Sequence, residues 1–136
     1  MDVREAAALP SEQPSANSER GEHELVLAGT TYRLRPSFTA LVAIEKKTGK
    51  SGLELVRMGN AGALHGLMLG TIAAELIRAG AEDAMTKAVN AERIGELIFE
   101  DGIPSATARL TLCLADAVTG GRTVSGEAKA AAAATE

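Results

Sequence analysis

Aromatic residues are almost absent from this sequence of 136 residues, which has no Trp, one Tyr and two Phe. Any core must therefore be built from Leu, Ile, Val, Met and Ala, and this composition suits packed helices better than a sandwich of two sheets. Cysteine is nearly absent as well. The single Cys113 excludes an internal disulfide framework and is typical of a reducing compartment.

Long apolar runs are also missing. No run approaches the roughly 20 residues that a membrane-spanning helix needs. The first residues include acids but no apolar segment of the kind found in signal peptides. We therefore expect a soluble, cytoplasmic protein with no membrane partner.

The sequence has no excess of positive charge. Its formal net charge is −4 and its pI is about 5.3, and the Lys and Arg residues are scattered among acidic ones. Binding to nucleic acid needs basic side chains gathered on one surface. The sequence therefore predicts no nucleic-acid partner.

Large apolar side chains are scarce at both ends of the chain. Apart from Ala and the initiator Met1, only Val3 and Leu9 are apolar within residues 1–22, and such a segment cannot bury enough surface to offset its ordering entropy. From Gly120 onward the chain turns to Gly, Ser, Lys and a run of alanines. We predict disordered tails over residues 1–22 and 120–136, and one domain over residues 23–119.

The domain begins with two short segments that favour β-strands. Residues 24–28 and 31–35 flank a turn at Gly29-Thr30, and this pattern predicts a β-hairpin. A two-stranded hairpin is marginally stable by itself, so one of its faces must pack on other elements. Only helices are available for that role in the rest of the sequence.

Helical periodicity dominates the rest of the domain. Ser37 and Ser51 are suitable N-caps, Ser51 with Glu54 in a capping box, and Gly49 is suited to end the first helix. Asn90 is a candidate N-cap further on. The predicted helices cover residues 37–47, 51–58, 63–80, 82–89, 90–101 and 104–119. The predicted fold class is therefore mainly α with an N-terminal β-hairpin (α+β), a small domain of about four to six helices.

Three glycines, Gly62, Gly66 and Gly70, recur every four residues at the start of the longest predicted helix. Glycine inside a helix costs about 1 kcal/mol relative to alanine, so this spacing needs a physical reason. Either another helix approaches this face closely, or the helix begins near Gly70 and the earlier glycines belong to a loop. The sequence leaves both alternatives open.

The segment Thr48-Gly49-Lys50-Ser51 looks like the end of a phosphate-binding P-loop. That loop needs a glycine five residues before Gly49, where this sequence has Ile44, and it follows a strand rather than a helix. A helix stop followed by an N-cap explains the same residues. We therefore predict no nucleotide or other cofactor at this segment.

Catalytic and metal-binding constellations are also missing from the pattern. His65 has no Asp, Glu or Cys at i+3 or i+4, so a metal site has no local support. Cys113 lies within the apolar stripe of the last helix, where a small core residue is expected. The carboxylate pairs Glu82-Asp83 and Glu100-Asp101 are adjacent in sequence, and adjacent residues on a helix do not face each other. We predict no catalytic, cofactor or metal site, and a protein that is not an enzyme.

Residues 24–55, ELVLAGTTYRLRPSFTALVAIEKKTGKSGLEL, resemble the start of tail assembly proteins from gene transfer agents and related siphophage-like tails. The family opens with a strand, a Gly-containing turn, a strand with a Tyr-x-Leu-Arg-Pro type sequence, and a helix with Ala-x-x-x-Ile-Glu before Thr-Gly. A long helix that ends near Ala-Gly also occurs in the family, as at Ala79-Gly80. The matching residues are Tyr32, Leu34, Arg35, Pro36, Phe38, Ala40, Ile44, Glu45, Thr48 and Gly49.

The family has been labelled both as tail tube-like and as tail assembly chaperone. A small, acidic, helical protein fits the chaperone better, because tail tube subunits are usually β-rich and their sheets line a ring. The resemblance therefore implies a tail assembly chaperone that binds the tape-measure protein in the bacterial cytoplasm while the tail tube forms. Tail tube subunits are a further candidate partner, and a homo-oligomer is a candidate state.

Such a chaperone needs an apolar face or groove that receives an amphipathic helix. The candidate partner-binding residues are the apolar side chains of the first and the longest predicted helices, for each of which burial in the core is the alternative: Phe38, Leu41, Leu64, Leu67, Met68 and Ile72. The main alternative function is a structural tail or tail-tube-associated component that stays in the particle. A regulatory helical module or an enzyme would need a basic helix or a catalytic constellation, and the sequence has neither.

Overall fold

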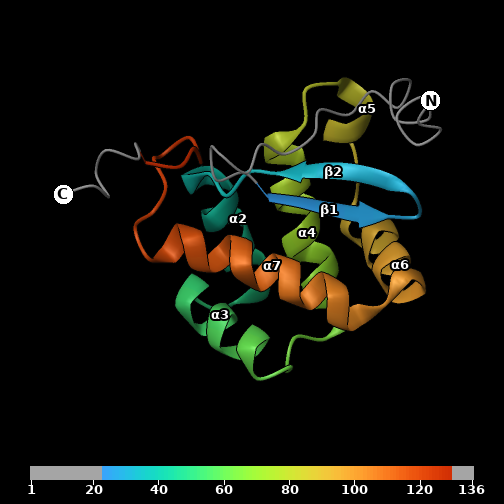
Figure 1. Cartoon of the computed structure of the whole chain (residues 1–136), viewed down its shortest axis with the longest axis horizontal. Helices are drawn as coiled ribbons and strands as arrows, with labels where there is room; N and C mark the ends of the chain where they lie inside the picture. Colours follow the sequence, from blue (N-terminus) through green and yellow to red (C-terminus); the bar gives the residue numbers. More distant parts are fainter. Residues whose placement is uncertain (1–22, 130–136) are drawn as a thin grey trace, which may run out of the picture.

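A computed structural model describes residues 23–129 of the chain. Within this range the protein has two strands and six helices, in agreement with the predicted mainly α domain with an N-terminal hairpin (Figure 1). The elements are β1 (His23–Leu27), β2 (Thr30–Leu34), α2 (Phe38–Thr48), α3 (Gly52–Asn60), α4 (Gly66–Gly80), α5 (Ala84–Lys87), α6 (Ala91–Asp101) and α7 (Ile103–Val118). None of these helices is both long and apolar enough to cross a membrane.

The hairpin packs one face on the helices. β1 and β2 pair in antiparallel fashion with Leu25 opposite Tyr32, and the turn lies at Ala28-Gly29, one residue earlier than predicted. Both turn residues have positive φ, 51° for Ala28 and 81° for Gly29, as a tight hairpin turn requires. The Ala28 N–H donates to Asp101 Oδ2 at 2.9 Å, which ties the turn to the end of α6.

The predicted N-caps Ser37 and Ser51 are confirmed, whereas the Glu54 carboxylate of the predicted capping box lies 3.7 Å from the Arg57 Nη1. The Ser37 Oγ accepts from the Ala40 N–H, and the Ser51 Oγ accepts from the Glu54 N–H, both at 3.1 Å. Gly49 ends α2 with φ 72°, a conformation that glycine adopts without steric cost. These contacts account for the Thr-Gly-Lys-Ser segment as a helix stop followed by an N-cap.

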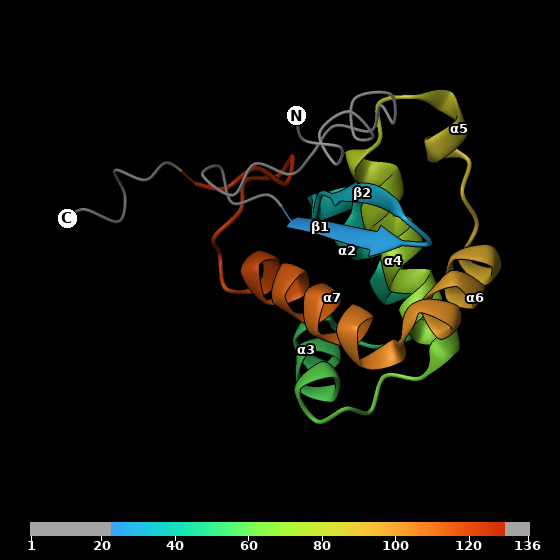
Figure 2. The same ribbon diagram turned by 45° about the vertical axis from the view of Figure 1, so that its right-hand side comes forward.

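The long helix α4 lies at the centre of the molecule, with the hairpin, α2, α6 and α7 around it (Figures 1 and 2). Most of its apolar residues are fully buried, including Leu69, Ile72, Leu76 and Ile77. Because other elements cover α4 on several sides, it buries apolar residues on more than one face and supplies much of the aliphatic core.

Each of the two alternatives for the glycine series holds for part of it. Gly62 has φ +70° and lies in the loop before α4, which begins at Gly66 rather than at residue 63. Gly70 instead lies inside α4 at a close helix crossing: a Cβ there would come 2.5 Å from the Ala91 carbonyl oxygen and 3.1 Å from the Gly95 Cα. Gly70 and Gly95 thus let the backbones of α4 and α6 approach each other.

The later helices follow the predicted order with shifted bounds. The predicted helix over residues 82–89 is reduced to the single turn α5, whose N-cap Asp83 accepts from the Thr86 N–H. Asn90 caps α6 as predicted, and its Oδ1 accepts from the Arg93 N–H at 2.7 Å. In α7, Leu110, Cys113 and Leu114 are buried, as the apolar stripe indicated.

Residues 120–129, which the sequence assigned to the C-terminal tail, contact the helical body. The Arg122 side chain is buried, and its two terminal nitrogens donate to Asp116 Oδ2 at 2.8 Å and to the Gly126 carbonyl at 2.9 Å. The Phe38 N–H donates to the Val124 carbonyl at 2.8 Å, which joins this segment to the start of α2. The other residues of the two predicted tails, 1–22 and 130–136, lie outside the described part of the chain.

Candidate protein-binding groove

The structure distributes the six predicted partner-binding residues over core and surface. Ile72, Leu64 and Met68 are buried, at 0%, 5% and 7% exposure, and Leu41 is partly buried against the core. Leu67 and Phe38 are the exposed members, at 71% and 61%. Phe38 is the first residue of α2 and Leu67 is the second residue of α4, so these six residues do not form one continuous binding surface.

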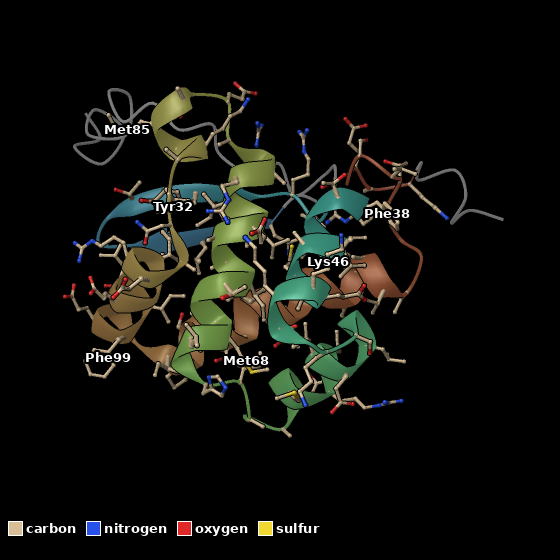
Figure 3. All side chains as sticks on the ribbon, turned by 180° about the vertical axis from the view of Figure 1, so that it is seen from behind. Tyr32, Phe38, Lys46, Met68, Met85 and Phe99 are labelled. Carbon is tan, nitrogen blue, oxygen red and sulfur yellow. The ribbon has the colours of Figure 1, made fainter. Side chains whose placement is uncertain are left out.

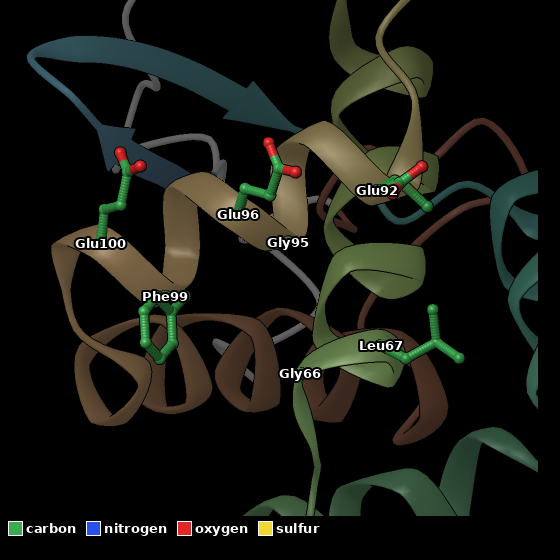
Figure 4. A pocket seen from close by; sticks show the side chains of 8 residues that line it. Gly66, Leu67, Glu92, Gly95, Glu96, Phe99 and Glu100 are labelled. Atoms are coloured by element: carbon green, nitrogen blue, oxygen red, sulfur yellow. The ribbon is translucent and has the colours of Figure 1, made fainter.

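A groove lies between the first turn of α4 and the outer face of α6. Its volume is about 410 Å³, and it is lined by Gly66, Leu67, Ala91, Glu92, Gly95, Glu96, Phe99 and Glu100. Figure 4 shows Phe99 from α6 and Leu67 from α4 on either side of the hollow, with the three glutamates in a row along α6. Of the predicted partner-binding residues, only Leu67 lines this groove.

The small residues explain how the groove forms. The close approach of α4 and α6 at Gly70 and Gly95 leaves Gly66 and Ala91 beside the crossing, where neither residue has a long side chain to fill the space. A Cβ added at Gly66 would meet no atom within 4 Å. The groove is therefore open at the N-terminal end of α4, while the helix crossing at Gly70 and Gly95 is tightly packed.

Two sides of α6 have opposite character. Ile94 and Ile98 are buried against the core, whereas the glutamates at positions 92, 96 and 100 follow one another at a spacing of four residues and are exposed. Phe99 is 74% exposed and Leu67 is 71% exposed, so two large apolar side chains stand beside three carboxylates. One of these carboxylates, Glu96, pairs with Arg93 on the same helix at 2.9 Å.

The sequence pattern did not single out Phe99 or the row of glutamates. Phe99 lies outside the apolar stripe of α6 that Ile94, Leu97 and Ile98 form, and a large aromatic residue off that stripe was the available signal. The i, i+4, i+8 spacing of the glutamates was a second signal. The position of Leu67 beside them could not be read from the sequence, because it depends on how α4 crosses α6.

Cys113 and His23 both lie close to Asp116. Cys113 is buried, and this burial raises the pKa of its thiol to about 12, with nearby Arg122 acting to lower the pKa and Asp116 acting to raise it. His23 contacts Asp116 Oδ2 at 2.9 Å. Among residues 23–129, no group of three or more His, Cys, Asp or Glu side chains could hold a metal ion.

A second hollow, of about 370 Å³, lies between α2, α4 and the C-terminal segment and holds an ion-pair network. Glu75 accepts from Lys47 at 2.5 Å and from Arg78 at 2.6 Å. Burial of Glu75 acts to raise the pKa of its carboxyl, but the hydrogen bonds and charges of Lys47 and Arg78 outweigh it and lower the pKa below its ordinary value. The network links α2 to α4 and has the character of a structural contact.

The described residues thus form a helical domain with a surface groove that is lined by two large apolar side chains, Leu67 and Phe99, and by three glutamates. Residues 20–120 match the family described as Phage tail tube protein, GTA-gp10. The match spans well over half of the chain, so the protein belongs to this family of phage and gene transfer agent tail proteins. The curated proteins and the solved structures that were compared with the chain gave no match.

Proposed function

We propose that the protein is a tail assembly chaperone that binds the tape-measure protein while the tail tube forms. The observation that carries the proposal is the groove between α4 and α6, where two exposed large apolar side chains, Leu67 and Phe99, line the same hollow. Exposed apolar patches in grooves are typical of surfaces that receive a partner. A tape-measure protein is a long helical chain, and a helix is the natural occupant of such a groove.

The secondary structure also supports an assembly role. A tail tube subunit is expected to use sheets to line a ring, whereas residues 23–129 contain one sheet of two strands. The buried Leu25, Leu27 and Leu34 commit one face of this sheet to the core of the same chain. A β-rich ring could not be built from such a hairpin alone.

The second candidate function is a structural tail component that remains in the particle. The family description favours it, because it names a tail tube protein. Such a component could use the same groove to hold its neighbours. The two functions therefore need the same kind of surface and differ in whether the protein leaves its partner.

Co-expression with a tape-measure protein from the same genome tests the proposal. A chaperone is expected to keep the tape-measure protein soluble with many copies bound, because repeated weak sites on one chain add up through multivalency. It should be depleted from finished particles. If the tape-measure protein stays insoluble and mass spectrometry finds the chain in stoichiometric amounts in purified particles, the structural alternative replaces the chaperone.

A further inference from the structure

We propose that the α4–α6 groove binds an amphipathic helix of the partner that carries Lys or Arg beside its apolar stripe. The proposal rests on the proposed function for the identity of the partner, which is the tape-measure protein. It adds the site, the secondary structure of the bound segment and the sign of its charge.

The dimensions of the groove suit about two turns of a helix. In the row of glutamates, Glu100 lies eight residues after Glu92 in α6, which is about 12 Å along the helix axis. The hollow of about 410 Å³ runs between this row and the start of α4, with the small residues Gly66, Ala91 and Gly95 along its floor. A helix laid here could insert one or two apolar side chains between Leu67 and Phe99 and approach the floor closely.

The charge of the groove selects a basic partner. All charged residues in its lining are glutamates, at positions 92, 96 and 100, and all three are exposed. Like charges four residues apart on a helix repel each other and destabilise it, and Arg93 offsets this repulsion at Glu96 only. A Lys or Arg on the partner would relieve the repulsion that remains, and charge complementarity of this kind also speeds association.

Two other occupants of the groove fit its row of glutamates and its apolar side chains less well. In a symmetric contact, a second copy of the chain would bring the same row of glutamates against this one, with like charges facing each other. The segment 1–22 contains Arg4 and Arg20 but, besides its alanines and Met1, only Val3 and Leu9 as apolar residues, so it offers little to place between Leu67 and Phe99. Both occupants have distinct outcomes in the experiment below.

The experiment uses the full chain labelled with ¹⁵N and overlapping synthetic peptides that cover the tape-measure protein. We expect the peptides that bind to combine apolar residues at helical spacing with Lys or Arg, and to shift amide signals in α6 and in the first turn of α4. Affinities are then measured by fluorescence anisotropy for the wild type and for the double variant Leu67→Ser/Phe99→Ser. We expect this variant to bind at least about tenfold more weakly, because two exposed apolar anchors are lost.

Matched variants separate the groove from the rest of the surface. Met85→Ser/Val124→Ser removes two apolar side chains of similar exposure, 83% and 75%, from other elements and should change affinity by no more than about twofold. Glu96→Gln/Glu100→Gln should weaken binding about threefold to tenfold at low salt and much less at high salt. Glu54→Gln/Glu127→Gln changes the net charge equally and should have little effect.

The outcomes distinguish the groove from the proposed function. If tape-measure peptides bind the wild type and both apolar variants equally, or shift signals on other elements, the assignment of the groove as the binding site is wrong. The chaperone proposal then still stands. If neither the peptides nor the full tape-measure protein binds, both fail. If deletion of residues 1–22 shifts the groove signals of the free protein, or if dilution does so, the occupant is the chain's own segment or a second copy, and the proposed partner helix is overturned.

Discussion

Cys113 shows how burial controls the reactivity of a single residue. Its side chain is fully buried in α7 and its thiol pKa is raised to about 12, so at pH 8 the native thiol is both protonated and inaccessible. We expect no modification by a thiol reagent such as iodoacetamide in the native state, and rapid modification after denaturation with guanidinium chloride. Mass spectrometry of the two samples checks this. Equal modification of both would show that α7 opens readily in the native protein.

Glu75 provides a pH-dependent contribution to stability. Because Lys47 and Arg78 lower its pKa in the folded state, the carboxylate stabilises the protein at neutral pH, and this contribution is lost as the pH falls through the folded pKa. Glu75→Gln should therefore reduce the free energy of unfolding by about 1–2 kcal/mol at pH 7. The difference from the wild type should shrink towards pH 3.

Urea unfolding at several pH values measures this difference. Glu127→Gln is the control, because Glu127 is exposed and no ion pair is described for it. A constant difference between Glu75→Gln and the wild type across the pH range would contradict the assigned role of the ion-pair network.

The residue-scale predictions that held were those set by local chemistry. Ser37, Ser51 and Asn90 accept hydrogen bonds from backbone N–H groups within three residues, so the sequence alone locates them. The neighbours Leu67 and Met68 show the limit of prediction from local sequence. Both fit the apolar pattern of one helix, yet Leu67 is 71% exposed and Met68 is 7% exposed, because the position of α6 and the other elements around α4 decides which side of the stripe is covered.

At the scale of helices, the crossing of α4 and α6 depends on the absence of a side chain at Gly70. Gly70→Ala would place a Cβ 2.5 Å from the Ala91 carbonyl oxygen, and backbone cannot move aside as a flexible side chain can. We expect a loss of about 1–3 kcal/mol in unfolding free energy. Gly66→Ala on the same helix meets no atom within 4 Å and should leave stability unchanged or raise it by up to about 1 kcal/mol.

Thermal and urea unfolding of these two alanine variants gives the comparison directly. Because the substitution and the helix are the same, the intrinsic preference of alanine for helices acts in a similar direction in both. A Gly70→Ala protein as stable as Gly66→Ala would mean that the two helices are not held together at this crossing.

The groove itself belongs to this scale, and this is why the sequence predicted only part of it. Gly66, Leu67 and the residues of α6 are separated by more than twenty positions in the chain, and no periodicity within either helix reports the distance between them. A close helix approach was one of the two alternatives that the glycine series left open, and the structure has such an approach at Gly70. Figure 3 shows Phe38 and Phe99 at opposite ends of the molecule, so exposed aromatic character alone could not have identified the groove.

At the scale of the whole molecule, the segment after α7 contributes to the stability of the domain. A chain that ends at residue 119 loses the contact of Arg122 with Asp116 and the hydrogen bond from the Phe38 N–H to the Val124 carbonyl. We expect such a chain to be about 2–3 kcal/mol less stable than one that ends at residue 129. Urea unfolding of the two truncated chains beside the full chain provides the measurement. Equal stability of all three would support the predicted domain boundary at residue 119.

The Asp116 carboxylate is hydrogen-bonded to two side chains, those of His23 at the start of β1 and Arg122 after the end of α7. The groove lies at the other end of α7, which has 16 residues and is about 24 Å long. Figures 1 and 2 both show α6 far from the beginning of β1 and from the C-terminal segment. A label, an affinity tag or a fused domain joined at residue 23 or 129 would therefore start at the end of the molecule opposite the groove in which we propose that the partner binds.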